Sequence, residues 1–368
     1  MRRLALLLTV LALGHAPAAA DEVGSVSYVE GMPEIVREGR VLHQEVDFGF
    51  RVENFDWIET DERSALEIAF DPQTGIDASV SVDADTQFHI DLSGLASEQT
   101  GAIDLVAGTV RVVARALSGG SRFQVRTSSA SMGVRGTTFA VSGGPAGEIL
   151  VTAEEGLVEV SDPSGRSLFA SPGEAVEVDE IAARFRTVRY EQESLAGFRA
   201  RWREQRLEEL ARRAPEILRF LGRRYRSSRE RFVDAYRELM RRRAVIDRWI
   251  DQSGRGARPP ATAREEAREL AATLLRVRAT MMRFETAHAQ LVRILPVVRD
   301  LVAEVEPVPG FTASDLYEQL AAERDVMRER FAHVRHVLKL YARRSGGRTP
   351  FEFFERLQDT QDDAAPGR

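Results

Sequence analysis

Apolar and polar residues alternate along the first half of this chain. From Val23 to Val178, short segments with a period of two are bounded by Gly, Pro, Asp or Ser. Such alternation places one face of a strand in a core and the other in water. Clear examples are ALEIAFD (65–71), ASVSVD (78–83), QFHIDL (87–92), TVRVVA (109–114) and RFQVRT (122–127). At least eight such segments predict an all-β domain over residues 21–184, built as an antiparallel sandwich, roll or short solenoid.

The second half follows a helical period after a connection at residues 179–193. We expect helices over 194–213, 215–252 and 262–306, and a fourth that begins after Thr312 or Ser314 as its cap. The third carries apolar residues at alternating spacings of 4 and 3, which is typical of a coiled-coil seam: Leu270, Leu274, Val277, Met281, Phe284, Leu291, Leu295, Val298 and Val302, with His288 among them.

These helices predict an all-α antiparallel bundle with coiled-coil character over residues 185–358. The breaks between helices are SGRGARPP (253–260) and EPVPGF (306–311), both rich in Gly or Pro. Pro296 lies inside the third helix and predicts a kink near Val292. A short amphipathic stretch at 350–357 and a disordered tail at 359–368 complete the chain.

The first 20 residues have the pattern of a cleaved signal peptide. Arg2 and Arg3 precede an apolar run from Leu4 to Leu13, and small residues lead to a cleavage site after Ala20. The run is about half of the ~20 residues that span a bilayer. No later segment is apolar enough to span, so we expect a soluble periplasmic or secreted protein.

Charge divides the chain more sharply than length does. Residues 21–184 hold 29 acids and 11 arginines, a net charge of −18, whereas residues 185–368 carry a net charge of +10. Either the two domains attract each other, or the basic half meets an anionic partner such as an envelope glycan or lipid. Lys339 is the only lysine and cysteine is absent, so stability rests on the cores without disulfides. We expect no nucleic acid partner for an exported chain.

The segment FQVRTSSASMGVRGTTFAV (123–141), followed by ILVTAEEGLVEV (149–160) and SPGEAVEV (171–178), resembles the FecR domain family. The resemblance covers residues 23–180 and is strongest over 108–180, with the signature at 123–178. It implies an extracytoplasmic protein-interaction module. In the best known members, a membrane-spanning regulator passes a signal from an outer-membrane receptor to a sigma factor. This sequence has a signal peptide where those members have a cytoplasmic domain and a membrane span.

The signature supplies the candidate binding residues, which are Gly133, Val134, Arg135, Gly136, Thr137, Phe139, Glu155 and Gly156. The glycines suit a turn with a positive φ or a close backbone approach. Thr137 and Phe139 begin a strand that alternates into the core. Arg135 either pins a neighbouring loop or recognises a partner's carboxylate. We expect the stretch at 131–141 to be mainly structural, because none of its residues can act as a base or an activated nucleophile.

Three other groups of residues are weaker candidates for chemistry. His288, His333 and His336 could form a metal site in the bundle, but a polar seam residue and a solvated helix face explain them better. Asp83 and Asp85 could serve an enzyme as a carboxylate pair, although Asp-rich turns are usually only turns. The arginines of RRYRSSRER (223–231) and Arg241–Arg243 predict a solvated face or an anion contact.

The sequence therefore predicts a non-enzymatic envelope protein that senses or relays a signal through a protein partner. It implies no catalytic residue, metal or cofactor. The alternative is a structural protein whose basic helices bind peptidoglycan or other anionic envelope components.

Overall fold

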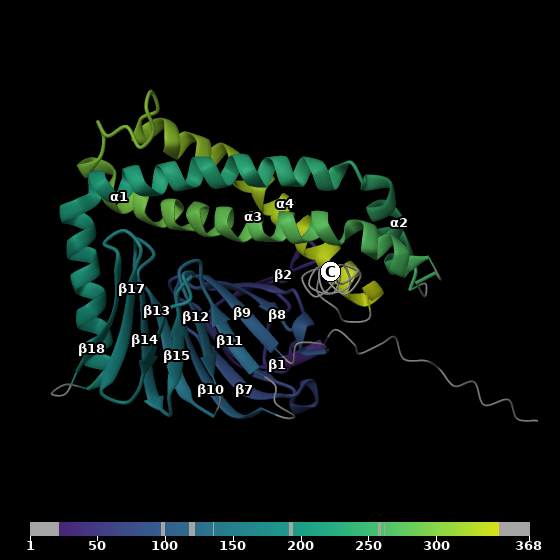
Figure 1. Ribbon diagram of the computed structural model, residues 1–368, viewed down its shortest axis with the longest axis horizontal. Coiled ribbons are helices and arrows are strands. Elements are labelled where there is room, and N and C mark those ends of the chain that lie inside the picture. Colours follow the sequence, from purple (N-terminus) through teal and green to yellow (C-terminus); the bar gives the residue numbers. More distant parts are fainter. Residues whose placement is uncertain are drawn as a thin grey trace, which may run out of the picture.

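The computed structural model describes residues 22–96, 100–117, 122–134, 136–190, 194–256, 259–260 and 262–345. Within these residues the chain forms a β region followed by a helical region (Figure 1). The expected signal peptide, the stretch at 350–357 and the tail at 359–368 lie outside the described residues.

Within the described residues the β region consists of two nine-stranded sheets, which confirms the predicted all-β class. Of the sandwich, roll and solenoid forms that the sequence left open, the sheets agree with a sandwich. Sheet A has the order β18-β17-β14-β13-β10-β7-β6-β1-β4, and sheet B has the order β16-β15-β12-β11-β9-β8-β5-β2-β3. The strands are β1 (Glu22–Glu30), β2 (Glu34–Arg37), β3 (Arg40–Val41), β4 (Arg51–Glu53), β5 (Trp57–Glu59), β6 (Ala65–Phe70), β7 (Ile76–Val82), β8 (Gln87–Asp91), β9 (Thr100–Ala107), β10 (Thr109–Leu117), β11 (Arg122–Arg126), β12 (Ser131–Val134), β13 (Thr138–Gly143), β14 (Ile149–Glu155), β15 (Val158–Ser161), β16 (Ser167–Ala170), β17 (Glu174–Asp179) and β18 (Arg184–Arg189).

The chain passes back and forth between the two sheets, and the strands of each sheet follow almost the order of the sequence. The domain is thus a sandwich in which the chain fills both sheets together, from one edge to the other. Nearly all neighbouring strands are antiparallel, and β9 with β11 is a parallel pair. A parallel neighbour requires a crossover connection, which β10 in the other sheet provides.

The alternation read from the sequence places the core between the sheets. In β6 the side chains of Leu66, Ile68 and Phe70 are buried, and those between them are half-buried. Each such side chain contributes about 1.5–3 kcal/mol when it leaves water. The core continues through β8 and β11 with Phe88 and Phe123.

The last strand lies in the segment that we expected to be a connection. β18 pairs antiparallel with β17 along its whole length, from Asp179↔Arg184 to Glu174↔Arg189. Alternating charges hold the pair together, since Arg186 Nη2 lies 2.7 Å from Glu177 Oε2 and Arg189 Nε lies 2.9 Å from Glu174 Oε1. The sandwich therefore continues to Arg189, beyond the expected boundary at residue 184.

Four α-helices lie in the described part of the helical region, and the first of them differs from the prediction. They are α1 (Leu195–Met240), α2 (Arg243–Gly254), α3 (Ala263–Val298) and α4 (Ala313–Ser345). The expected helices at 194–213 and 215–252 were wrongly separated, because α1 continues through Pro215. It bends sharply between a first arm beside β17 and β18 and a long second arm (Figure 1). A proline that removes a helical hydrogen bond explains such a bend.

The third helix is shorter than predicted. It ends at Val298, two residues after Pro296, and a 3-10 turn at Arg299–Leu301 follows, so the expected extension to residue 306 was wrong. All the apolar seam positions listed for it are buried. Thr312 caps α4: its Oγ1 accepts from the Asp315 amide at 3.2 Å, and its amide donates to Asp315 Oδ2 at 2.8 Å. The cap is therefore Thr312 and not Ser314.

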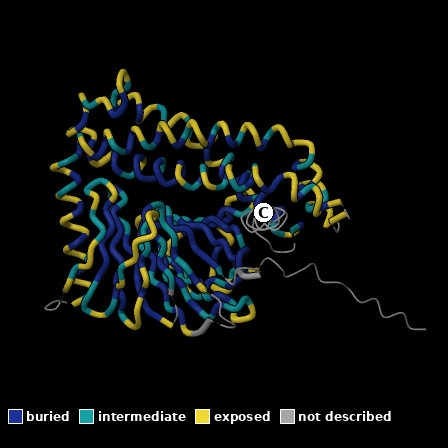
Figure 2. The backbone as a smooth tube through the Cα atoms, viewed as in Figure 1, coloured by how far each residue is buried: buried dark blue, intermediate teal, exposed yellow. Residues whose placement is uncertain are grey.

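The helical region packs against part of the outer face of each sheet. Phe198 and Trp202 of the first arm of α1 pack on Leu150 and Ala175, on the outer face of sheet A. The helices α3 and α4 lie against β9 and β2 of sheet B. Figure 2 shows buried backbone along the sides of the helices that face the sandwich and exposed backbone on the opposite sides.

Candidate functional site

The signature residues come together where the chain crosses between the sheets. Gly133 and Val134 end β12 in sheet B, and Phe139 lies in β13 of sheet A, fully buried in the core. Glu155 ends β14, where it pairs with Thr138. Arg135 lies outside the described residues, and nothing is inferred from its geometry.

Two glycines of the signature have a conformational role. Gly136 has φ +63° and Gly156 has φ +80°, both in the left-handed region that favours glycine. A Cβ on Gly156 would lie 2.5 Å from Thr137 Cγ2, so the second crossing turn packs directly on the first. The buried Thr137 carbonyl accepts from the Ala114 amide at 2.9 Å, which ties the turn to β10. These contacts agree with the structural role expected for this stretch.

Gly133 behaves differently, because nothing lies within 4 Å of where its Cβ would be. It pairs across sheet B with Glu159 of β15, which is exposed, and Glu159 in turn pairs with Phe169 of edge strand β16. Leu157 directly precedes β15 and is exposed, as Glu159 is. We call Gly133, Leu157, Glu159 and Phe169 the signature face. Phe169 is 49% and Leu157 is 56% exposed, so the face combines apolar and acidic groups in water.

A second group of polar residues joins the two regions of the chain. Acidic side chains of the sandwich meet basic side chains of the helices at several points along both sheets. The pairs are Arg206–Glu177 (3.3 Å), Arg199–Glu154 (3.4 Å), Arg328–Glu34 (2.5 Å), Lys339–Glu53 (2.5 Å), Arg224–Glu180 and Arg278–Asp91. The opposite net charges of the two halves therefore attract each other within the molecule, one of the two interpretations that the sequence left open.

The most buried part of this interface is a cluster of His89, Asp91, Asp104, Arg126 and Arg278. Arg126 donates to both carboxylate oxygens of Asp104, at 2.6 and 3.0 Å, and His89 Nε2 lies 3.2 Å from Asp104 Oδ2. Asp91 accepts from Arg278 of α3 and from the Ser93 hydroxyl. The carboxylates lie on β8 and β9, on the outer face of sheet B, and α3 closes over them.

Burial and the neighbouring charges shift the pKa values of His89 and Asp91 in opposite directions. Burial lowers the pKa of His89 to about 4, although Asp104 and Asp91 lie beside it. Burial alone would raise the pKa of Asp91, but Arg278 and Arg126 lower it below its usual range. At neutral pH the cluster thus holds a neutral His89 imidazole beside an ionised Asp91 carboxylate.

One nitrogen of His89 and one oxygen each of Asp91 and Asp104 lie within 4.8 Å of one another, a spacing that can suit a metal ion. The guanidinium groups of Arg126 and Arg278 already contact these carboxylate oxygens. A cation would have to displace both, so the donor set fits a buried ion-pair network better than a metal centre. Sequence reasoning missed this cluster, because QFHIDL reads as a strand with His89 and Asp91 facing water.

The three histidines considered for metal binding lie in different surroundings. His288 packs against the rings of Tyr225 and Phe284, as expected of a seam residue. His333 Nδ1 lies 2.9 Å from the Tyr236 hydroxyl. His336 Nδ1 lies 3.8 Å from Glu38 of the sandwich. Burial lowers the pKa of all three imidazoles.

Asp83 and Asp85 lie in the turn between β7 and β8, where Asp85 adopts φ +53°. Neither carboxylate makes an ion pair within the described part of the chain. Burial raises the pKa of Asp83, against the nearby Arg203 and Arg199. The residues therefore form a turn, as expected, that also borders a groove.

None of the helices in the described ranges is long and apolar enough to cross a membrane. Residues 56–159 match the family described as FecR protein, which confirms the resemblance seen in the sequence. No curated protein matches the chain. Two crystal structures of a candidate anti-sigma factor from Parabacteroides distasonis ATCC 8503 each align with 39% of this chain at 16% identity and a TM-score of 0.32. The aligned part spans 63% of that protein.

Proposed function

We propose that this chain, with a FecR domain at residues 56–159, acts outside the cytoplasm as a non-enzymatic module that binds another protein. In this role it senses or relays a signal in the cell envelope. The observation that carries the proposal is the FecR match, which covers the crossing turns of the signature and most of the core of the sandwich.

The signature face supports a protein as the partner. Exposed Phe169 and Leu157 beside an open glycine offer apolar contact, and Glu159 offers a charge that selects among partners. Aromatic side chains are enriched at protein interfaces. β16 is also an edge strand of only four residues, whose outer backbone groups can pair with an added strand. We propose that Arg135, between Gly133 and Gly136 in the sequence, contributes to recognition there.

Site-specific photo-crosslinking in whole cells tests this proposal. The single lysine, Lys339, is buried in an ion pair with Glu53, so amine-reactive cross-linkers report little. A benzophenone amino acid in place of Phe169 should capture a protein partner. The same group in place of Tyr317 on α4, which is 46% exposed, is the matched control.

The proposal is supported if a cross-linked product forms with the benzophenone group at position 169 but not at position 317, and if Arg135→Ala reduces its amount. If both positions give the same bands, or neither gives any, the signature face is not the docking surface. Amino-terminal sequencing of the purified protein checks the location, because the expected mature chain begins at Asp21.

The second candidate function, binding of peptidoglycan or an anionic lipid, rests on the exposed arginines of α1 and the residues after it. Arg223, Arg226 and Arg231 are exposed, as are Arg241 and Arg242. Co-sedimentation with peptidoglycan sacculi or anionic vesicles at low salt should detect such binding, because screening is weakest there. Absence of co-sedimentation at low salt removes this candidate.

A further inference from the structure

One end of the sandwich faces the helices across an open groove of about 600 Å³. The turns β1–β2, β5–β6, β7–β8, β9–β10 and β13–β14 form one wall. Arg203 and Leu207 of α1, with Arg293 of α3, form the other. This volume lies within the ~300–1,000 Å³ typical of sites for small ligands.

Opposite charges line the two walls without meeting. Arg203 of the helical wall makes no ion pair within the described residues, and the same holds for the carboxylates of Asp83 and Asp85 on the sandwich wall. Arg293 Nη1 donates to the backbone carbonyl of Asp85 at 3.0 Å and leaves its carboxylate free. Elsewhere along the boundary the cations of the helices contact the acids of the sandwich directly, as Arg278 contacts Asp91. At the groove, the described side chains of Asp83, Asp85 and Arg203 form no such ion pair.

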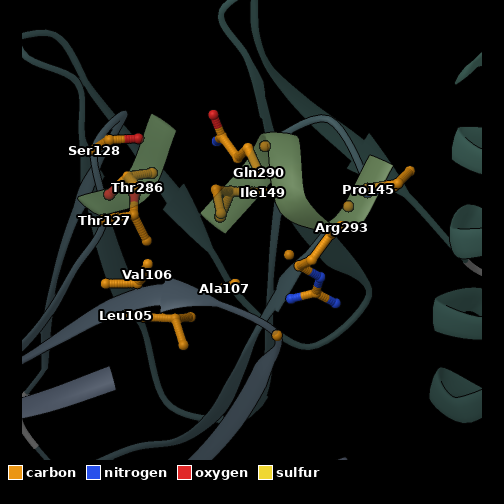
Figure 3. A pocket seen from close by; sticks show the side chains of 14 residues that line it. Leu105, Val106, Ala107, Thr127, Ser128, Pro145, Ile149, Thr286, Gln290 and Arg293 are labelled. Carbon is orange, nitrogen blue, oxygen red and sulfur yellow. The ribbon is translucent and has the colours of Figure 1, made fainter. Parts of the chain in front are cut away.

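The floor of the groove is rigid backbone with few side chains. The Gly143 amide donates to the Gly108 carbonyl at 2.8 Å, and a Cβ on Gly143 would lie 2.9 Å from that oxygen. Figure 3 shows the small cavity beside the groove, with Arg293 and Pro145 on one side of the view and Leu105 and Val106 on the other. Glycine at these positions lets the two turns approach each other closely, and neither Gly108 nor Gly143 adds a side chain to the floor.

We propose that this groove binds a short zwitterionic peptide. Its ammonium group would lie toward Asp83 and Asp85, and its carboxylate toward Arg203 and Arg293. Charge-assisted hydrogen bonds of this kind are about twice as strong as neutral ones, and guanidinium groups suit carboxylates in particular. The inference does not depend on the signature face, which is formed by other strands.

Titration calorimetry of the full-length protein with trialanine tests the proposal. Trialanine should bind saturably, and either amino-terminal acetylation or carboxy-terminal amidation should weaken binding by at least about tenfold, since each removes one charged contact. Arg203→Gln should reduce the difference between trialanine and its amide severalfold, because Arg293 remains on that wall. Asp83→Asn should reduce the difference between trialanine and its acetylated form severalfold, because Asp85 remains.

Arg219→Gln is the control, because Arg219 is exposed on α1 and does not line the groove. Arg203→Lys keeps the charge and should keep most of the affinity. Thermal unfolding by circular dichroism confirms that each variant is folded, which is expected because Arg203 and Asp83 are both exposed. Absence of saturable binding of trialanine overturns the proposal. So does equal binding of the doubly blocked peptide, or loss of affinity in the Arg219 variant as large as that in the Arg203 variant.

Discussion

Arg278 and Arg328 provide a matched test of how the helices are held on the sandwich. Both reach from the helices to a carboxylate of the sandwich, on Asp91 and Glu34 respectively. The first pair is buried, with 14% and 4% of the side chains exposed, and the second is open, with 46% and 36% exposed. We consider Arg278→Met and Arg328→Met, which remove the charge and keep an apolar stem.

The expected losses differ severalfold. Arg278→Met leaves Asp91 buried with Arg126, at 3.6 Å, and the hydroxyl and amide of Ser93 as partners. Breaking a buried pair costs about 3–5 kcal/mol, and the remaining Arg126 places this case near 3 kcal/mol. Arg328→Met opens a solvated pair and should cost at most about 1 kcal/mol. Both variants remove a guanidinium group, so the difference between the two losses comes from the burial of Asp91, which is left without that charge partner.

Urea unfolding at pH 7 measures both losses. Fluorescence can follow the sandwich and the helices together, because Trp57 lies in β5, Trp202 in α1 and Trp249 in α2. The double variant Arg278→Met with Asp91→Asn should regain most of the lost free energy of unfolding, because no charge then stays unpaired. Equal losses for the two single variants, or no recovery in the double variant, would refute the reasoning.

Other substitutions test the turns and the buried titratable groups. Gly156→Ala should lower the free energy of unfolding by more than about 1 kcal/mol, because an alanine there would have to adopt φ +80° and its Cβ would contact Thr137. Gly133→Ala should change the free energy of unfolding by less than about 0.5 kcal/mol, because its Cβ would meet no other atom. The midpoints of urea unfolding compare the two variants. Burial raises the pKa of Glu148 from 4.5 to about 7, so the folded state keeps a proton that the unfolded state has released, and stability should fall as pH rises from 4.5 to 7. The expected decrease in the free energy of unfolding over this range is about 3 kcal/mol, and it should be absent in Glu148→Gln. Urea unfolding of both proteins at several pH values measures it. His89 acts in the opposite sense, since its lowered pKa means that stability is lost as pH falls from 6.5 toward 4, and His89→Gln should flatten that limb of the same profile.

The elements of the fold were largely predictable because local patterns decide them. Alternation identified strands such as β6, and the 4 and 3 spacing identified the buried side of α3. The continuity of α1 was not predictable from Pro215, since a proline can begin a helix or bend one, and contacts on both sides decide between these outcomes. β18 was missed because half of its residues are arginines, which pair with the acids of β17.

The candidate site was less predictable, because it depends on what covers each face. His89 and Asp91 alternate with Phe88 and Ile90, and this pattern indicates a solvated side. In the folded chain α3 covers that side, and the polar residues become a buried network. The groove likewise joins Asp83 to Arg203, residues far apart in sequence, and no local pattern relates them.

The continuity of α1 also limits how the length of this chain can vary. Arg206 binds Glu177 on one side of the bend, and Leu218 and Leu221 enter the bundle on the other. One residue inserted between Arg206 and Leu218 would rotate everything beyond it by about 100° and shift it by about 1.5 Å, unless the helix unwound. The arginines of the bundle would then leave their partners on the sandwich. Insertions in the exposed turn at Asp162–Gly165 would only lengthen a loop, so tolerance to insertion should differ sharply between these two places.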